Sequence, residues 1–146
     1  MRVVIQRVTE ASVWINKQLH SQINEGLLIL LGIHKDDKEE QVIWMAKKCA
    51  NLRIFSDLND KMNLNLIDLQ KDALVVSQFT LYGDTTTSRR PDFFSAAPPL
   101  IAETLYNLFI NELSKLLNRD IKKGVFGAKM EVKLINDGPV TIFIEK

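Results

Sequence analysis

The chain has 146 residues, of which 46% are hydrophobic and 25% are charged. This composition is ordinary for a soluble globular protein and excludes the disordered and fibrous classes. The length fits one domain, residues 1–146, with a single core. Lys and Arg total 19 against 18 Asp and Glu. The net charge therefore gives no argument for nucleic-acid binding, and any such contact must come from local patches.

Two features predict the cellular compartment. The N-terminal apolar run is far shorter than a signal-peptide core, and no stretch approaches membrane-spanning length. The single Cys49 cannot form an internal disulfide, and it lies between Ala46 and Ala50 on an expected helix. We expect a buried, inert thiol there and a cytoplasmic protein.

Extended segments dominate the first part of the chain. Residues 2–8 and 11–15 alternate apolar and polar side chains, a turn follows at residues 16–17, and residues 19–23 return as another strand. Residues 27–33 form a continuous apolar run, which predicts a central strand buried on both faces.

A helix is expected from Glu39 to about Leu52, capped by Asp36 and Asp37. Short strands are expected at residues 53–55 and 62–65 around a turn. The apolar stripe of this helix should pack on the sheet and comprises Val42, Ile43, Ala46, Cys49 and Ala50.

Residues 73–81 read as a second central strand whose end turns polar. Four consecutive apolar residues predict burial on both faces. Ser77, Gln78 and Thr80 should then reach a place where the backbone is fixed and water is scarce. The simpler interpretation is that Ser77 and Thr80 only satisfy neighbouring backbone groups at a strand end.

A polar loop at residues 83–92 follows, and loops in that position often contact substrate. Pro98 and Pro99 then open the longest helix, which runs to residues 118–120, with Tyr106 and Phe109 expected in packing rather than in cofactor contacts. Lys122, Lys123 and Gly124 are expected to form a turn.

The last segment, residues 132–144, reads as strand, turn, strand. Asn136, Asp137 and Gly138 tolerate a positive φ, while Pro139 fixes its own φ and lacks an N–H donor. Alone, this pattern predicts a hairpin with a rigid corner.

Two of these segments together resemble the paired signatures of the D-aminoacyl-tRNA deacylases, enzymes that remove D-amino acids from tRNA. The signatures are Ser-Gln-Phe-Thr-Leu at residues 77–81 and Asn-Asp-Gly-Pro-Val-Thr at residues 136–141. The resemblance covers the whole chain and includes residues 2–8, 53–57, 61–65, 89–91 and 95–98.

The resemblance implies a mixed α/β, layered β/β/α single domain, a homodimer and no cofactor. It implies hydrolysis of the ester that joins a D-amino acid to the 3' acceptor end of tRNA, with L-amino acids spared and glycine not rejected. The implied catalytic residues are Ser77, Gln78, Phe79 and Thr80. The backbone N–H groups of Phe79 and Thr80 would stabilise the oxyanion, and a ribose hydroxyl of the substrate would assist. The Thr80 hydroxyl as nucleophile remains an alternative.

Chiral selection is assigned by the same resemblance to Gly138 and Pro139. It implies that this pair forms a cis peptide and enters the partner subunit's pocket, and that Arg7 holds the corner through its planar fork. Arg89, Arg90 and Lys129 are weaker candidates for tRNA contact, because each also fits a solvated surface. The basic pairs at residues 47–48 and 122–123 have the same two interpretations.

Other chemistries find less support in the sequence. His20 and His34 are isolated, and no His or Cys spacing matches a zinc site. Gly-x-Ser-x-Gly is absent, which speaks against a Ser-His-Asp hydrolase. The competing hypothesis is a module that binds the tRNA acceptor end without hydrolysing it. A third is a relative acting on mischarged L-amino acids, for which we expect changes around Phe79 and Gly138-Pro139 that this sequence does not show.

Overall fold

The two continuous apolar runs of the sequence form the centre of the sheet. In the computed structural model, which describes residues 1–146, strands β3 (Gly26–Gly32) and β6 (Asp72–Ser77) pair in parallel. Leu27, Ile29 and Leu31 point into one apolar cluster, while Leu28 and Leu30 contact a second cluster on the opposite face. Both faces are covered, so the run needs no polar alternation. The prediction of central strands buried on both faces is confirmed.

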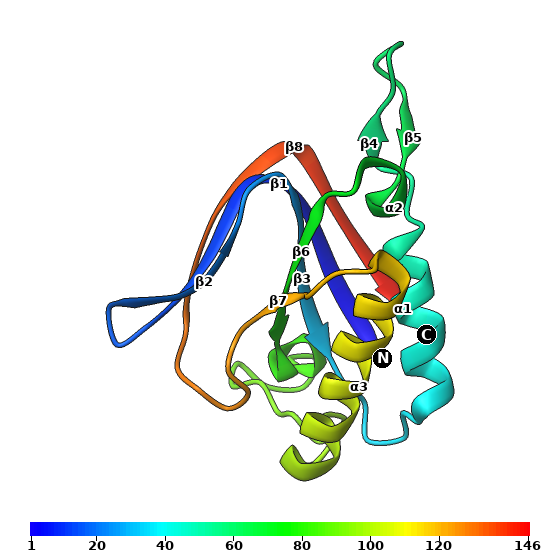
Figure 1. The fold of residues 1–146 in the computed structure, drawn as a ribbon. Coiled ribbons are helices and arrows are strands. Elements are labelled where there is room, and N and C mark those ends of the chain that lie inside the picture. The colour runs from blue at the N-terminus through cyan, green and yellow to red at the C-terminus, as the bar shows by residue number, and fades with distance from the viewer.

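The sheet curls until it nearly closes. Its order is β2 (Gln18–Ile23), β1 (Arg2–Ile15), β3, β6 and β7 (Lys122–Lys123), and β8 (Glu131–Glu145) also pairs with β1. Although β2 and β7 stand at opposite ends of this order, the Ser21 hydroxyl donates a hydrogen bond of 2.8 Å to the Lys123 carbonyl. Figure 1 shows β2 and the adjoining parts of β1 and β8 swinging out of the central plane.

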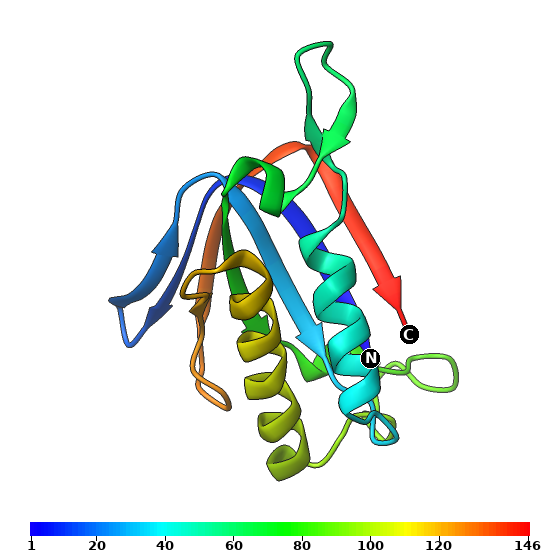
Figure 2. The same ribbon diagram turned by 45° about the vertical axis from the view of Figure 1, so that its right-hand side comes forward.

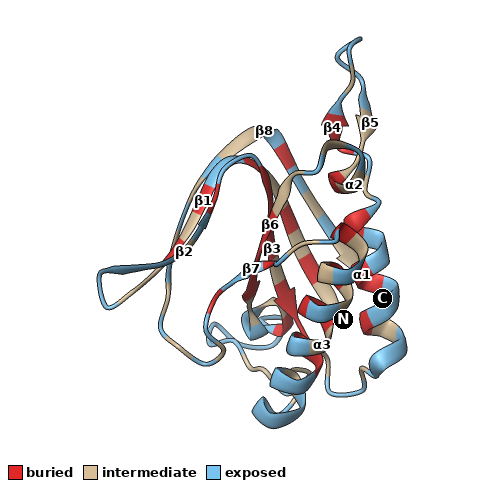
Figure 3. Ribbon diagram, in the orientation of Figure 1, coloured by how far each residue is buried: buried red, intermediate tan, exposed pale blue.

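Two helices cover the face of the sheet opposite the curled strands. They are α1 (Glu39–Ala50) and α3 (Pro99–Leu117), which lie side by side in Figure 2. Figure 3 shows that their buried residues face the sheet and their exposed residues face outward. Tyr106, Phe109 and Leu113 of α3 are fully enclosed in the main core. The layers are therefore helices, sheet and curled strands, and the predicted mixed α/β, β/β/α class is confirmed.

Smaller elements connect these layers. An arm of β4 (Phe55–Ser56) and β5 (Met62–Leu64) projects from the body of the protein (Figure 1). The one-turn helix α2 (Leu66–Leu69) follows, and the Asn65 side chain accepts a hydrogen bond of 2.9 Å from the Asp68 N–H. No helix of the protein combines the length and the hydropathy that crossing a membrane requires.

The predicted hairpin at the C-terminus is wrong. Strand β8 runs in one direction throughout, with Val132 opposite Val13 and Ile144 opposite Val3 of the equally continuous β1. Likewise, residues 2–8 and 11–15 belong to one strand rather than two. Each long strand supports the other, so the Asn-Asp-Gly-Pro segment interrupts the ladder without reversing the chain.

The predicted cap of α1 also differs. The helix begins after Lys38, whose N–H donates to the Gln41 side chain at 3.0 Å. The Asp37 carboxylate instead accepts from the His34 N–H and from the N-terminal amine, each at 2.7 Å. On the stripe of this helix, Met45 is fully buried, whereas Ile43 is 36% exposed.

The predicted turn at residues 122–124 is also wrong. Lys122 and Lys123 form β7, which pairs in parallel with Leu74 and Val75 of β6. So short a strand depends on a partner distant in the sequence rather than on its own composition.

Candidate functional site

The first signature lies where β6 ends. Ser77 pairs with Leu31 of β3, and the Gln78 N–H donates to the Leu31 carbonyl at 2.8 Å. The chain then leaves the sheet in a 3₁₀ helix, η1 (Phe79–Tyr82). The predicted strand to residue 81 is therefore too long by one turn of helix.

Because the strand stops early, the side chains of the signature differ in exposure. Ser77 and Gln78 are partly buried, whereas Thr80 is exposed and Phe79 is 57% exposed. The expectation that Thr80 lies where water is scarce is wrong. The Gln78 amide donates a hydrogen bond to the Thr80 hydroxyl, so these two side chains act as one polar unit.

The backbone of this turn presents amide donors. The first hydrogen bond of η1 runs from the Leu81 N–H to the Gln78 carbonyl at 3.3 Å. The N–H groups of Phe79 and Thr80 precede that bond, and amides at the start of a helix have no partner within it. They are available to an acceptor outside the helix.

A pocket of about 420 Å³ opens beside this turn. Its first wall is the end of β6 and the start of η1, its second is the start of α3, and its third is the segment after β7. The lining residues are Val76, Ser77, Gln78, Phe79, Ala97, Pro99, Ala102, Phe126, Gly127, Ala128, Met130 and Val132. None of these side chains is ionisable, so the pocket offers an apolar surface, a hydroxyl, an amide and backbone groups.

Sequence reasoning missed the third wall. Phe126, Ala128 and Met130 follow neither a helical nor a strand period, and the segment belongs to no regular element. A signal was available, because Gly124 and Gly127 bracket apolar residues in an aperiodic stretch, which is typical of a shaped loop. Gly127 has a φ of 73°, a conformation that glycine adopts at little cost.

The second signature forms a bend in β8 that is held from β1. The Gly138-Pro139 peptide is cis, as the resemblance implies, and both residues are exposed. The Asn136 side-chain amide donates to the carbonyls of Arg7 and Val140 at 3.0 and 3.1 Å. These contacts close the bend on both sides.

Arg7, on β1, contacts the same bend through its guanidinium group. Its Nε donates to the Asp137 carbonyl at 3.2 Å and forms an ion pair of 2.9 Å with the Asp137 carboxylate. Its Nη1 donates to the Ile54 carbonyl at 2.5 Å. The Arg7 side chain is only 12% exposed, and its fork joins β8 to the base of the arm.

Within one chain, the two signatures lie apart. Figures 1 and 2 show the bend of β8 at one end of the sheet and the end of β6 at the other. Neither Gly138 nor Pro139 lines the pocket that contains Ser77, Gln78 and Phe79. A single copy of this chain therefore does not combine them into one site.

The three basic candidates differ in position. Lys129 is exposed and lies in the sequence between the lining residues Ala128 and Met130. Arg89 and Arg90 lie on the exposed loop after η1 and do not line it. None of the three forms a salt bridge.

The other titratable candidates lie outside the pocket. His20 is exposed, and His34 packs its ring on Tyr82 at 5.2 Å between centroids. Cys49 is fully buried, and this burial raises the pKa of its thiol to about 12, which agrees with the predicted inert thiol. No three His, Cys, Asp or Glu side chains come close enough together to hold a metal ion.

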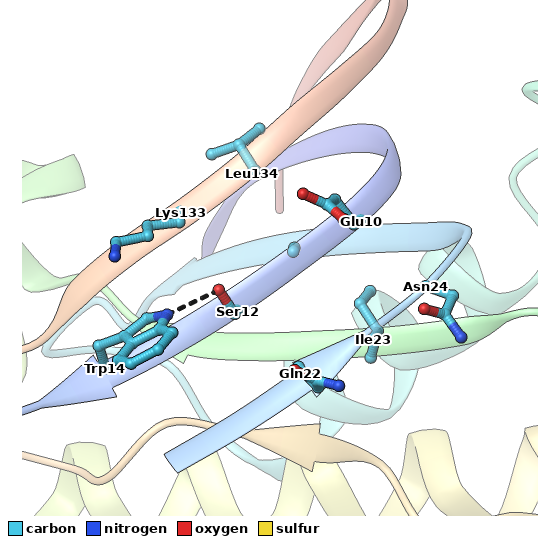
Figure 4. Close-up of a pocket in the computed structure, with 9 residues that line it drawn as sticks. Glu10, Ser12, Trp14, Gln22, Ile23, Asn24, Lys133 and Leu134 are labelled. Carbon is cyan, nitrogen blue, oxygen red and sulfur yellow. Dashed lines mark hydrogen bonds between the residues drawn. The ribbon is translucent and has the colours of Figure 1, made fainter. Parts of the chain in front are cut away.

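A second pocket, of about 330 Å³, lies on the curled part of the sheet between β1, β2 and β8 (Figure 4). The Trp14 indole N–H donates to the Ser12 hydroxyl at 3.0 Å, and the Lys133 ammonium lies 4.3 Å from the Trp14 ring centroid. The indole N–H and the ring face of Trp14 therefore both have partners within the protein. The pocket contains none of the predicted site residues, and we assign it no role.

The chain is similar in sequence to a family of known proteins. Residues 4–145 match the family described as D-Tyr-tRNA(Tyr) deacylase. The chain is 51% identical to the D-aminoacyl-tRNA deacylase of Salinibacter ruber, covering 100% of this chain and 97% of that protein. It is 53% identical to the enzyme of the same name from Porphyromonas gingivalis, covering 99% and 97%.

Two solved structures share the fold. One is described as c-Myc DNA Unwinding Element Binding Protein and is 42% identical, with a TM-score of 0.95 over 100% of this chain and 99% of that one. The other, a probable eukaryotic D-amino acid tRNA deacylase, is 15% identical, with a TM-score of 0.88 over 98% and 97%. With a family match that spans nearly its whole length, this chain belongs to the D-Tyr-tRNA(Tyr) deacylase family.

Proposed function

We propose that this protein hydrolyses the ester bond of D-aminoacyl-tRNA, and of glycine mischarged on tRNA, releasing free tRNA and the amino acid. Family membership and the names of relatives at about 50% identity support the reaction. The observation that carries the mechanism is a pocket without ionisable side chains beside the N–H groups of Phe79 and Thr80, which lie at the start of η1 and have no partner within that helix.

The reaction is the attack of water on the ester carbonyl carbon. A tetrahedral oxyanion forms, the bond from carbon to the ribose oxygen breaks, and the proton from water ends on the ribose oxygen. The N–H groups of Phe79 and Thr80 stabilise the oxyanion, an effect of about 100- to 1,000-fold per donor. The neighbouring ribose hydroxyl orients the water, and the walls of the pocket hold the ester in place.

The Gln78–Thr80 side-chain pair and the Ser77 hydroxyl border the same space. In this mechanism they orient the substrate, and the Thr80 hydroxyl does not act as the nucleophile. The exposure of Thr80 and its hydrogen bond from Gln78, together with the lack of a general base in the pocket, support this assignment, because a neutral hydroxyl is a weak nucleophile without one.

Chiral selection requires a second copy of the chain. The exposed Gly138-Pro139 corner, held by Arg7, enters the pocket of the partner subunit, where its backbone excludes the side chain of an L-amino acid. Selection by backbone tolerates many D side chains and does not reject glycine, which has none. The separation of the two signatures within one chain supports this arrangement.

The tRNA approaches with its 3' acceptor end. The exposed Lys129, next to two lining residues of the pocket, pairs with backbone phosphate, and Arg89 and Arg90 extend the contact outward. In this proposal residues 1–146 act as one deacylase domain in the cytoplasm, where aminoacyl-tRNA is used, and no cofactor takes part.

A non-catalytic binding module remains the second candidate, because one solved relative at 42% identity is described as a DNA-element binding protein. The test is the rate of ester loss from one tRNA carrying either the D or the L form of the same amino acid, with a chelator present. We expect rapid loss of the D form with the L form spared. Loss of neither form would favour the binding module, and loss of both would refute the chiral role of Gly138-Pro139.

A further inference from the structure

The three segments that form the walls of the pocket are joined at one carbonyl oxygen just behind them. The Val75 carbonyl accepts a hydrogen bond of 2.9 Å from the Gly124 N–H and another of 2.9 Å from the Tyr106 hydroxyl. Val75 directly precedes the wall formed by β6 and η1. Gly124 opens the segment that contains Phe126, and Tyr106 lies on α3, one turn beyond the lining residue Ala102.

The Tyr106 ring contacts the third wall directly. Its centroid lies 5.9 Å from that of Phe126, with the ring planes at 50°, a tilted arrangement that aromatic pairs favour. Tyr106 is only 2% exposed, and burial raises the pKa of its hydroxyl, which stays a proton donor throughout the physiological range. The hydroxyl fixes the ring, and the ring supports the wall.

The first wall has its own independent anchor. The Gln78 N–H is bonded to the Leu31 carbonyl of β3 at 2.8 Å, so the amides of Phe79 and Thr80 do not depend on Tyr106 for their position. The Gly124 N–H keeps its bond to the Val75 carbonyl without Tyr106. Removing the Tyr106 hydroxyl would therefore loosen the third wall around Phe126 and leave the oxyanion donors in place.

We infer that Tyr106 is a positioning residue that sets the distance between the Phe126–Val132 wall and the end of β6, and thereby the fit of the terminal adenosine of the substrate. This inference rests on the proposed function. It predicts a separation of kinetic effects: losing the hydroxyl weakens substrate binding, while the chemical step proceeds at nearly its normal rate, because binding shared by ground and transition states affects KM rather than kcat.

The test uses Tyr106→Phe with Tyr82→Phe as a matched control. Tyr82 is also buried, at 4% exposure, but its hydroxyl has no hydrogen-bond partner and it does not line the pocket. For Tyr106→Phe we expect KM for D-aminoacyl-tRNA to rise about threefold to tenfold, the effect of one typical hydrogen bond, with kcat within twofold of wild type. Tyr82→Phe should leave both constants unchanged.

A denaturant titration of each variant separates a positioning role from a purely structural one. If Tyr106→Phe lowers the unfolding midpoint but keeps the wild-type KM, the inference is overturned. A fall in kcat without a rise in KM, or an equal rise in KM for Tyr82→Phe, overturns it as well.

A binding measurement distinguishes failure of this inference from failure of the proposed function. If the wild-type protein does not hydrolyse the ester, the proposed function fails, and adenosine binding followed by NMR titration becomes the readout. Weaker adenosine binding by Tyr106→Phe, by the same threefold to tenfold, supports the positioning role. Equal affinity, or no adenosine binding by the wild type, refutes it.

Discussion

The contribution of the Phe79 backbone amide can be isolated by comparing two substitutions at that position. Phe79 is the first residue of η1, a position where proline is tolerated. The preceding Gln78 has φ −144° and ψ 78°, which lies outside the α region that a following proline disfavours. Phe79→Pro therefore deletes the N–H, and Phe79→Ala is the control that keeps it.

The two variants lose the same ring. The edge-to-face contact of Phe79 with Phe93, at 4.9 Å between centroids, disappears in both, and its contribution of about 0.5–1.5 kcal/mol cancels in the comparison. The remaining difference between the two variants is the N–H of residue 79, which is one oxyanion donor. We expect kcat for D-aminoacyl-tRNA to be about 100- to 1,000-fold lower in Phe79→Pro than in Phe79→Ala, or roughly 2.7–4 kcal/mol of transition-state stabilisation.

The assay is single-turnover hydrolysis at saturating protein, with circular dichroism and a denaturant titration to verify that both variants fold equally well. Values of kcat within threefold of each other in two folded variants would refute the role of the Phe79 amide. The oxyanion would then have to be stabilised by other groups, with the Thr80 amide the next to examine.

Three further predictions concern side chains. Thr80→Ala should keep kcat within about tenfold of wild type because the Thr80 amide survives, whereas complete loss of activity in a folded variant would make the hydroxyl the nucleophile. Arg7→Ala should lower D-selective activity or the D/L ratio roughly tenfold or more, since charge-assisted hydrogen bonds to two carbonyls are lost. Unchanged rates on both substrates would remove Arg7 from the site. Cys49 should resist iodoacetamide at pH 8 in the native protein and react in guanidinium. Because burial raises the pKa of Cys49 from 9.0 to about 12, its contribution to stability is complete below pH 9 and is lost between pH 9 and about 12. The unfolding free energy of the wild type should therefore fall more steeply over that range than that of Cys49→Ala, and parallel curves would contradict the assignment.

The sequence predicted the elements whose local signal agrees with their tertiary surroundings. The apolar runs at β3 and β6 allow few structures other than buried strands, and Pro99 starts a helix for a local reason. The Asn65 and Asp68 pair was also readable, since a capping residue followed three positions later by an acid marks a helix start. This pair marks the start of α2, an element absent from the expectations above.

The errors share one physical cause, which is pairing between distant segments. Nothing local to Asp137 and Gly138 indicates that β8 continues in the same direction past the bend, because the continuity depends on the whole length of β1. Lys122 and Lys123 are a strand only because β6 is beside them. The 3₁₀ helix after Ser77 has no sequence signature distinct from that of a strand, and so Thr80 was placed in the interior rather than at the surface.

The candidate site also contains residues that the sequence identified and residues that it did not. The candidate residues of η1 and of the bend were identified by resemblance. The resemblance also implied that Arg7 holds the bend, and its hydrogen bond to the Asp137 carbonyl agrees with that role. For the wall that contains Phe126 and Met130, the glycines at 124 and 127 indicate a shaped loop but not its place, because it is held by a hydrogen bond from Gly124 to the distant Val75.

The pairing of β1 with β8 also bears on how the protein is made. Val3 lies opposite Ile144, so during synthesis β1 waits for its partner β8 until the ribosome has added all the residues between them. At about 5–20 residues per second that wait is on the order of ten seconds, and such distant pairing is intrinsically slow. Throughout that interval β1 has an open edge and apolar side chains that invite aggregation. The bend held by Arg7 joins the first and last strands, and we therefore expect it to be among the last features of the protein to form.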